Sequence, residues 1–254
     1  MPHIRAGAAS IHDPKQWRAE DRVACGEHAW AVLSGTTHSV GMENEADAAA
    51  PVAEAIVRSS VPPSLDAMLE CFLAMDRAVI EWAGRSDLGL DGLWGCGLGA
   101  VLLAVDGDVV RIAHVGTLRA YRLTVATDGA PLIAEALTVD HSFEELARRR
   151  SDLGVRNDGD PSAPLVLSSL GHGHVPRIDL TRVELHRATR LVLVSRGARP
   201  ALDTPLGYLR EIRSPVECAQ RLCAEARTRA GESPHHASAI VVDVDPEPAT
   251  GPYR

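Results

Sequence analysis

Arg196, which stands between Ser195 and Gly197, is well suited by type and context to bind an anion. Its guanidinium group is a rigid fork of donors that matches a phosphate or a carboxylate. The alternative is structural, because the same cation could instead be paired with a nearby acid such as Asp21. Asp21, which follows Glu20, could itself be a metal ligand or a solvated acid at a strand edge. The sequence leaves these alternatives open.

The histidines offer a second kind of chemistry. His235 and His236, together with His28 and His38, could supply nitrogen ligands to a soft metal such as zinc. The chain has 11 histidines spread along its length, however, and such a spread favours composition as the explanation.

Other apparent motifs have simpler explanations. The GCGLG stretch at 95–99 resembles a phosphate-binding loop, but it precedes a predicted strand, so no helix N-terminus would face an anion. We expect close backbone packing there. No motif places a histidine beside Cys96, which is therefore expected to be a small buried apolar residue. The basic run at 148–150 is expected on the solvated face of a helix.

The elements that must position these residues follow from hydrophobic periodicity. Apolar runs at 100–105 and 109–115 flank a DGD turn, and runs at 119–125 and 131–137 flank TDG, so two hairpins are predicted. Apolar residues at spacings of three and four predict a helix at 65–82, the alanine-rich stretch at 47–57 and the segment at 143–153 are also expected to be helical, and a capping box predicts another helix from 215. Further strands are expected at 29–33, 178–185, 190–194 and 239–244. Antiparallel strands with helices between blocks indicate an α+β fold.

Composition narrows the class of protein. The chain has 254 residues, of which 45% are hydrophobic, enough for one large domain or two small ones. A formal net charge of -8 argues against a nucleic-acid or anionic-membrane binder. There is no apolar stretch of about 18 residues, no signal-peptide pattern, and no C-x-x-C pair among the 5 cysteines. These features predict a reduced, cytoplasmic protein.

Several segments, in order, resemble the metal-dependent protein phosphatase family (PPM, type 2C), especially its bacterial serine/threonine members. HVGTLRAYRL at 114–123 is similar to the family's HVGDSRAYRL, and LTVDHS at 137–142 matches LTxDHS. Weaker matches in the same order are AED at 19–21, WAVLSG at 30–35, LVLVSRG at 191–197 and SPHHASAIVV at 233–242. The resemblance extends from about residue 15 to 245. It implies a four-layer α/β/β/α sandwich, with two packed antiparallel sheets flanked by helix pairs.

The resemblance also implies a chemistry, from which this sequence departs. The family holds two manganese or magnesium ions with carboxylates and a glycine carbonyl, and a metal-bridging water attacks a phosphoserine or phosphothreonine. Only Asp21 and Gly35 of those metal positions are preserved here. The remaining positions carry residues that are not carboxylates: Ser34, Thr117, Arg196 and His236. Because two dications need several carboxylates to offset their repulsion, the metal site is predicted to be dismantled.

The resulting expectation is a single phosphatase-like domain over residues 1–254, with frayed ends, that acts as a pseudophosphatase. Its function would be binding, as a regulator or scaffold for a phosphoprotein, a kinase or an active phosphatase, with no metal cofactor, no catalytic residue, no nucleic acid and no membrane. The alternative is a serine/threonine phosphatase with residual activity through a remodelled metal site. The segment at 142–165, where the family carries a flap, matches no family signature.

Overall fold

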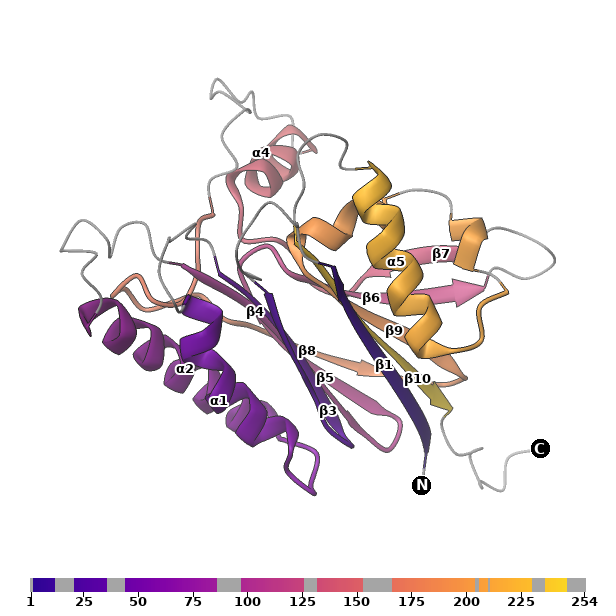
Figure 1. Ribbon diagram of the computed structural model, residues 1–254, viewed down its shortest axis with the longest axis horizontal. Helices are drawn as coiled ribbons and strands as arrows, with labels where there is room; N and C mark the ends of the chain where they lie inside the picture. Colours follow the sequence, from indigo (N-terminus) through magenta and orange to yellow (C-terminus); the bar gives the residue numbers. More distant parts are fainter. Residues whose placement is uncertain are drawn as a thin grey trace.

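Two antiparallel sheets form the centre of the computed structural model (Figure 1), which describes residues 2–11, 21–35, 44–85, 97–125, 132–152, 166–203, 206–209, 211–229 and 236–245. The first sheet contains, in spatial order, β1 (His3–Ile11), β10 (Ala237–Asp245), β9 (Thr189–Val194), β6 (Arg119–Val125) and β7 (Leu132–Ala136). The second contains β2 (Asp21–Cys25), β3 (Ala29–Gly35), β4 (Leu98–Asp106), β5 (Val109–Val115) and β8 (Asp179–Glu184).

Helices cover the outer faces of both sheets. The pair α1 (Glu45–Val57) and α2 (Leu65–Arg85) packs on the second sheet, and α5 (Pro215–Arg229) packs on the first with two short 3-10 helices, η1 (Arg196–Ala201) and η2 (Leu206–Leu209). A further helix, α4 (Phe143–Asp152), lies beyond one end of the sheets in Figure 1. None of the described helices is long and apolar enough to cross a membrane. The layers confirm the predicted α+β sandwich, with η1 and η2 beside α5 on the first sheet.

The strands alternate their apolar side chains between two layers of core, as the period of two in a strand requires. Residues of β4 show this division: Val101, Leu103 and Val105 face the first sheet, whereas Leu102 and Ala104 face the helix pair. The layer between the sheets is almost entirely apolar, so it excludes water and fixes the sheets against each other. Its fully enclosed members include Trp30, Val32, Ile112, Leu118, Leu191, Leu193, Ile240 and Val242.

Serine hydroxyls cap the starts of two helices, one of them the helix that the capping box in the sequence predicts. The Ser64 hydroxyl accepts the Ala67 N–H at 3.1 Å at the start of α2, and the Ser214 hydroxyl accepts the Glu217 N–H at 3.4 Å at the start of α5. Each cap satisfies a donor that the first turn of a helix leaves without a partner.

The N-terminal segment differs from the expectation of a frayed end. His3–Ile11 forms the edge strand β1, which pairs in antiparallel register with the whole of β10, from His3 opposite Asp245 to Ile11 opposite Ala237. The sequence did not predict this strand, because Gly7 and several alanines weaken the alternation of apolar and polar residues that marks a strand. Small residues are required here because α5 lies directly against β1.

The Gly7→Ala substitution is therefore expected to destabilise the protein by about 1–3 kcal/mol, because an added Cβ would lie 2.7 Å from the Pro215 carbonyl carbon. Gly84→Ala is the control: nothing lies within 4 Å of an added Cβ at this exposed helical position, so it should be neutral or stabilising by up to about 1 kcal/mol. Urea unfolding of both variants checks the pair. Equal effects at the two positions would contradict the close approach of α5 to β1.

Candidate functional site

Strand register brings most of the sequence-predicted site residues to one end of the sandwich. Asp21, at the start of β2, lies opposite Ser34 near the end of β3, and Gly35 lies opposite Leu98 at the start of β4. Thr117 occupies the turn between β5 and β6 at the same end. The other sheet contributes residues that follow β9 or precede β10: Ser195, Arg196 and His236.

Asp21 is a buried carboxylate with hydroxyl and imidazole groups as neighbours. Only 4% of the residue is exposed, and burial raises the pKa of its carboxyl group. The hydroxyls of Ser34, Ser195 and Ser238 and the imidazole of His236 oppose that rise in pKa only in part. Its Oδ2 atom accepts no hydrogen bond among the described residues. The site therefore contains one carboxyl group whose charged form is disfavoured by burial, despite the hydroxyls and the imidazole around it.

The serine hydroxyls are engaged with one another and with the backbone. The Ser238 N–H donates to Ser195 Oγ at 3.0 Å, the Ser195 N–H donates to the Ser238 carbonyl at 2.9 Å, and the hydroxyls of Ser10 and Ser238 are 2.8 Å apart. Ser195 and Ser238 are each only 1% exposed. These hydrogen bonds join β1, β10 and the end of β9, so the serine hydroxyls hold the ends of these strands together.

Arg196 does not form the ion pair with Asp21 that was one of its two expected roles. It is the first residue of η1 and is exposed, and within the described part of the chain no ion pair joins it to Asp21. The two residues differ in burial, since Arg196 is exposed at the start of η1 whereas Asp21 is buried. The other expectation, anion binding, stays a prediction. Thr117 is half-buried, and Gly35 is buried.

The remaining sequence-level candidates do not form a zinc site with each other where the structure describes them. His28 lies 3.8 Å from Glu27, whereas His236 lies beside Asp21. His38, His235, Glu20, Cys96 and the segment at 153–165 lie outside the described residues. The basic run of α4 is solvated as predicted, since Arg148 and Arg149 are 61% and 50% exposed in their pairs with Glu145.

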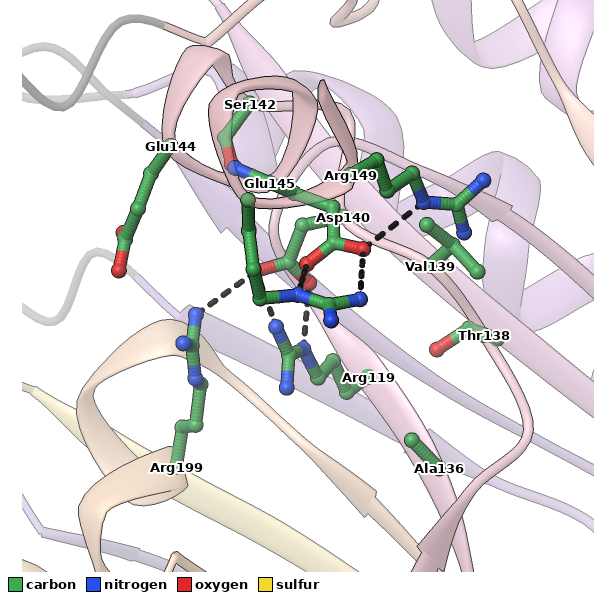
Figure 2. A pocket seen from close by; sticks show the side chains of 11 residues that line it. Arg119, Ala136, Thr138, Val139, Asp140, Ser142, Glu144, Glu145, Arg149 and Arg199 are labelled. Carbon is green, nitrogen blue, oxygen red and sulfur yellow. Dashed lines mark hydrogen bonds and ion pairs between the residues drawn. The ribbon is translucent and has the colours of Figure 1, made fainter. Parts of the chain in front are cut away.

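A second polar cluster, which the sequence motifs contained but did not identify, lies at the start of β6. Asp140, whose side chain is 2% exposed, accepts two hydrogen bonds from Arg119, at 2.5 and 2.7 Å, and a third from Arg199 at 2.7 Å (Figure 2). Burial would lower the pKa of Arg119, but its hydrogen bond to Asp140 raises it. The pair lines a cavity of about 420 Å³ together with Glu145 and Arg148 of α4. Because these arginines are already paired with carboxylates, the cluster stabilises the fold rather than presenting free cations.

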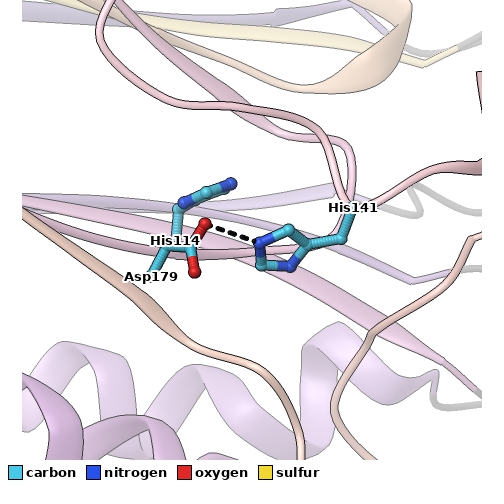
Figure 3. A group of neighbouring side chains, drawn as sticks. All are labelled: His114, His141 and Asp179. Atoms are coloured by element: carbon cyan, nitrogen blue, oxygen red, sulfur yellow. Dashed lines mark hydrogen bonds and ion pairs between the residues drawn. The ribbon is translucent and has the colours of Figure 1, made fainter. Parts of the chain in front are cut away.

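A third cluster joins β5, β8 and the segment that follows β7. His114, His141 and Asp179 each offer a ligand atom, and these atoms lie within 4.8 Å of one another (Figure 3). Burial lowers the pKa of His114 to about 4, and the neighbouring His141 adds to this effect. The two histidines lie in the HVG and DHS motifs, but only the register of β5 with β8 places Asp179 opposite His114. Sequence spacing carries no signal for that contact.

Asp140→Asn should lower the free energy of unfolding by about 3 kcal/mol or more, because it removes the buried carboxylate that pairs with Arg119 and leaves Arg199 with only the exposed Asp203. Asp203→Asn is the matched control: its side chain is 53% exposed and lies 3.5 Å from the same Arg199, so the cost should stay below about 1 kcal/mol. Urea unfolding at pH 7 measures both. Similar losses in the two variants would show that burial of the Asp140 pair contributes little.

Asp21→Asn is expected to stabilise the protein at pH 7 by about 1 kcal/mol, because it removes a carboxyl group whose charged form is disfavoured by burial more than the neighbouring hydroxyls and His236 favour it. Arg196→Ala should change stability by less than about 0.5 kcal/mol, and the two changes should add. A double-mutant cycle by urea unfolding checks this. A coupling energy above about 1 kcal/mol between the two positions would show that Asp21 and Arg196 do form an ion pair.

No protein-family model matches the chain, and no curated protein matches it in sequence. Solved structures do match it along nearly the whole length. The catalytic domain of the serine threonine protein phosphatase PstP in complex with 2 manganese ions has a TM-score of 0.73 at 22% identity, over 96% of this chain and 100% of that one. PppA, described as a key regulatory component of T6SS in Pseudomonas aeruginosa, has a TM-score of 0.74 at 20% identity, over 95% of this chain and 98% of that one. The PPM Ser-Thr phosphatase MsPP from Mycobacterium smegmatis, in complex with cacodylate, has a TM-score of 0.71 at 21% identity, over 96% of this chain and 98% of that one. The chain therefore has the fold of the PPM serine/threonine phosphatases, as its motifs predicted.

Proposed function

We propose that this chain is a pseudophosphatase, a phosphatase-like module over residues 1–254 that binds a protein partner and does not hydrolyse phosphoesters by the two-metal route. The observation that carries the proposal is the set of donors at the sandwich end. Among the described residues at the family's metal positions, Asp21 is the one carboxylate, and it is surrounded by serine hydroxyls and the imidazole of His236.

This donor set does not fit two hard dications. Magnesium and manganese prefer anionic oxygen ligands, and two such ions a few ångströms apart repel each other strongly unless several carboxylates intervene. The hydroxyls of Ser195 and Ser238 are already hydrogen-bonded to the protein, so they are poor substitutes. The cation of Arg196 at the same end adds repulsion. A metal-bridging water nucleophile therefore has no support from these side chains.

The same end of the sandwich is compatible with binding a phosphorylated partner. Arg196 is exposed, and its guanidinium can donate two parallel hydrogen bonds to a phosphate without cleaving it. A net charge of -8 favours a protein over a nucleic acid as the partner. PppA, a structural relative, is named as a key regulatory component, which supports a regulatory role for this chain, and we propose that it acts in the cytoplasm. We propose a phosphoprotein, a kinase or an active phosphatase as the partner.

The first test is catalytic. With millimolar manganese or magnesium, the protein should show no metal-stimulated hydrolysis of p-nitrophenyl phosphate or of a phosphothreonine peptide, and the melting temperature should not rise on adding magnesium or manganese. Metal-stimulated turnover near ~1 s⁻¹, abolished by Asp21→Asn, would overturn the proposal in favour of a phosphatase with a remodelled site.

The second test restores the lost carboxylates. The triple variant Ser34→Asp, Arg196→Asp, His236→Asp should gain a manganese-dependent rise in melting temperature of several degrees, since a ligand at 100 times its Kd stabilises by about 2.7 kcal/mol. The control makes the same three types of change at exposed positions away from the site: Ser60→Asp, Arg227→Asp, His186→Asp. A manganese response in the control, or in the wild type, would count against the dismantled site.

Phosphate recognition by Arg196 is tested by binding. A phosphothreonine peptide should bind the wild type more tightly than the unphosphorylated peptide does, and Arg196→Ala should abolish that difference. Arg227→Ala, another exposed arginine, should retain it. Fluorescence anisotropy measures all three, and an unchanged preference in Arg196→Ala would place phosphate recognition elsewhere.

A further inference from the structure

His114, His141 and Asp179 come together from three segments of the chain that are distant in sequence. His114 and Asp179 are opposite each other in the antiparallel pairing of β5 with β8, and His141 reaches them from the segment after β7. The two imidazole rings have centroids 4.6 Å apart (Figure 3). His114 is 1% exposed and His141 5%, whereas the side chain of Asp179 is 30% exposed. The cluster is therefore closed on the histidine side and open on the side of the carboxylate.

One nitrogen of the His114 ring has no hydrogen-bonding partner in the described part of the chain. Its Nε2 lies 2.7 Å from the Val139 carbonyl, which can only accept, so Nε2 carries the proton. Nδ1 then holds a lone pair, and among the described residues it has no hydrogen-bonding partner although it is buried. A buried acceptor left in this way is destabilising, and such atoms in native proteins call for an unseen ion or water.

The other two side chains form a pair of the kind found around metal ions. His141 Nε2 lies 3.1 Å from Asp179 Oδ2, a separation close to the spacing of ligand atoms in a tetrahedral zinc site with bonds of about 2.0–2.2 Å. The Val139 carbonyl fixes the ring of His114 through its far nitrogen, as carbonyls commonly do for metal-binding histidines.

We propose that His114 Nδ1, His141 Nε2 and an Asp179 oxygen bind a single Zn²⁺ or similar transition-metal ion, separate from the sandwich-end site. Two imidazoles favour such a metal over magnesium, and the fourth position faces solvent beside Asp179. Binding moves the His141 proton from Nε2 to Nδ1, so the ring stays neutral and no proton is lost. The Gly116 N–H contact to that Nδ1, long at 3.4 Å, is given up.

Arg177 is the competitor of the metal in this arrangement. Its guanidinium lies 3.0 Å from Asp179 Oδ1 and 3.2 Å from Oδ2, and its side chain is 70% exposed. A cation bound to Asp179 must displace it. Removing Arg177 should therefore strengthen metal binding, an effect that a purely structural cluster of hydrogen bonds would not produce.

The experiment is a titration of the chelator-treated full chain with Co²⁺, followed by displacement with Zn²⁺. The wild type should develop the visible absorption of a tetrahedral cobalt site, lost on adding zinc. Asp179→Asn should weaken cobalt binding at least 10-fold, Arg177→Ala should tighten it several-fold, and the exposed His186→Ala should leave it unchanged. Asp179 is partly exposed, so its variant should fold; circular dichroism verifies this, and His114→Gln provides a second loss of ligand.

Two results would overturn the site. Absence of the visible cobalt absorption at millimolar Co²⁺ would show that the three side chains form only a structural cluster and bind no metal ion. A band that survives Asp179→Asn but disappears in Asp21→Asn would place the metal at the sandwich end, and that second outcome alone would also count against the proposed pseudophosphatase.

Discussion

The apolar layer between the two sheets is the constraint on which the candidate site depends. Side chains from both inner faces interdigitate there, so neither sheet can slide along the other without exposing a row of valines, leucines and isoleucines. The fixed alignment makes strand ends from both sheets meet at one place. Asp21 on the second sheet can therefore face Ser195 and Ser238 of the first, although these residues are distant in sequence.

Because these strand ends meet in a buried place, an uncompensated charge there has a large effect on the free energy of folding. In a water-filled cleft a lost carboxylate would be replaced by solvent, but here burial raises the pKa of Asp21 despite the three serine hydroxyls and the imidazole of His236 that oppose the rise. Where a fold buries several polar side chains together, they must be either cations with matching carboxylates or neutral groups that form hydrogen bonds with one another. The bonded hydroxyls of Ser10, Ser195 and Ser238 are of the second kind.

The sequence predicted local structure better than it predicted side-chain contacts. The hairpin around Gly107 was recognisable because a two-residue turn with a φ of +64° favours glycine, and α2 was recognisable from its apolar spacing. β1 was missed because small residues that fit against α5 do not alternate in hydrophobicity. Family motifs brought Asp21, Ser34 and Arg196 to one end correctly. The direction of the Arg196 side chain could not be predicted, because it depends on where η1 begins after β9.

The segment at 138–142 links the clusters that the motifs contain. Its residues each bind a different partner: Thr138 accepts the Ala120 N–H, Val139 accepts from His114, Asp140 pairs with Arg119 and Arg199, and the His141 N–H donates to the Gly116 carbonyl. Gly116 is suited to this contact because its φ of +86° favours a residue without a Cβ, and an added Cβ would lie 3.0 Å from the Gly99 Cα. The turn at 116–117, which carries one of the altered metal positions, is thus held by the same segment that carries His141. A metal ion on His114, His141 and Asp179 would fix the side chain of His141, whose N–H remains bonded to the Gly116 carbonyl, so the two sites are joined by the backbone although their ligands are separate.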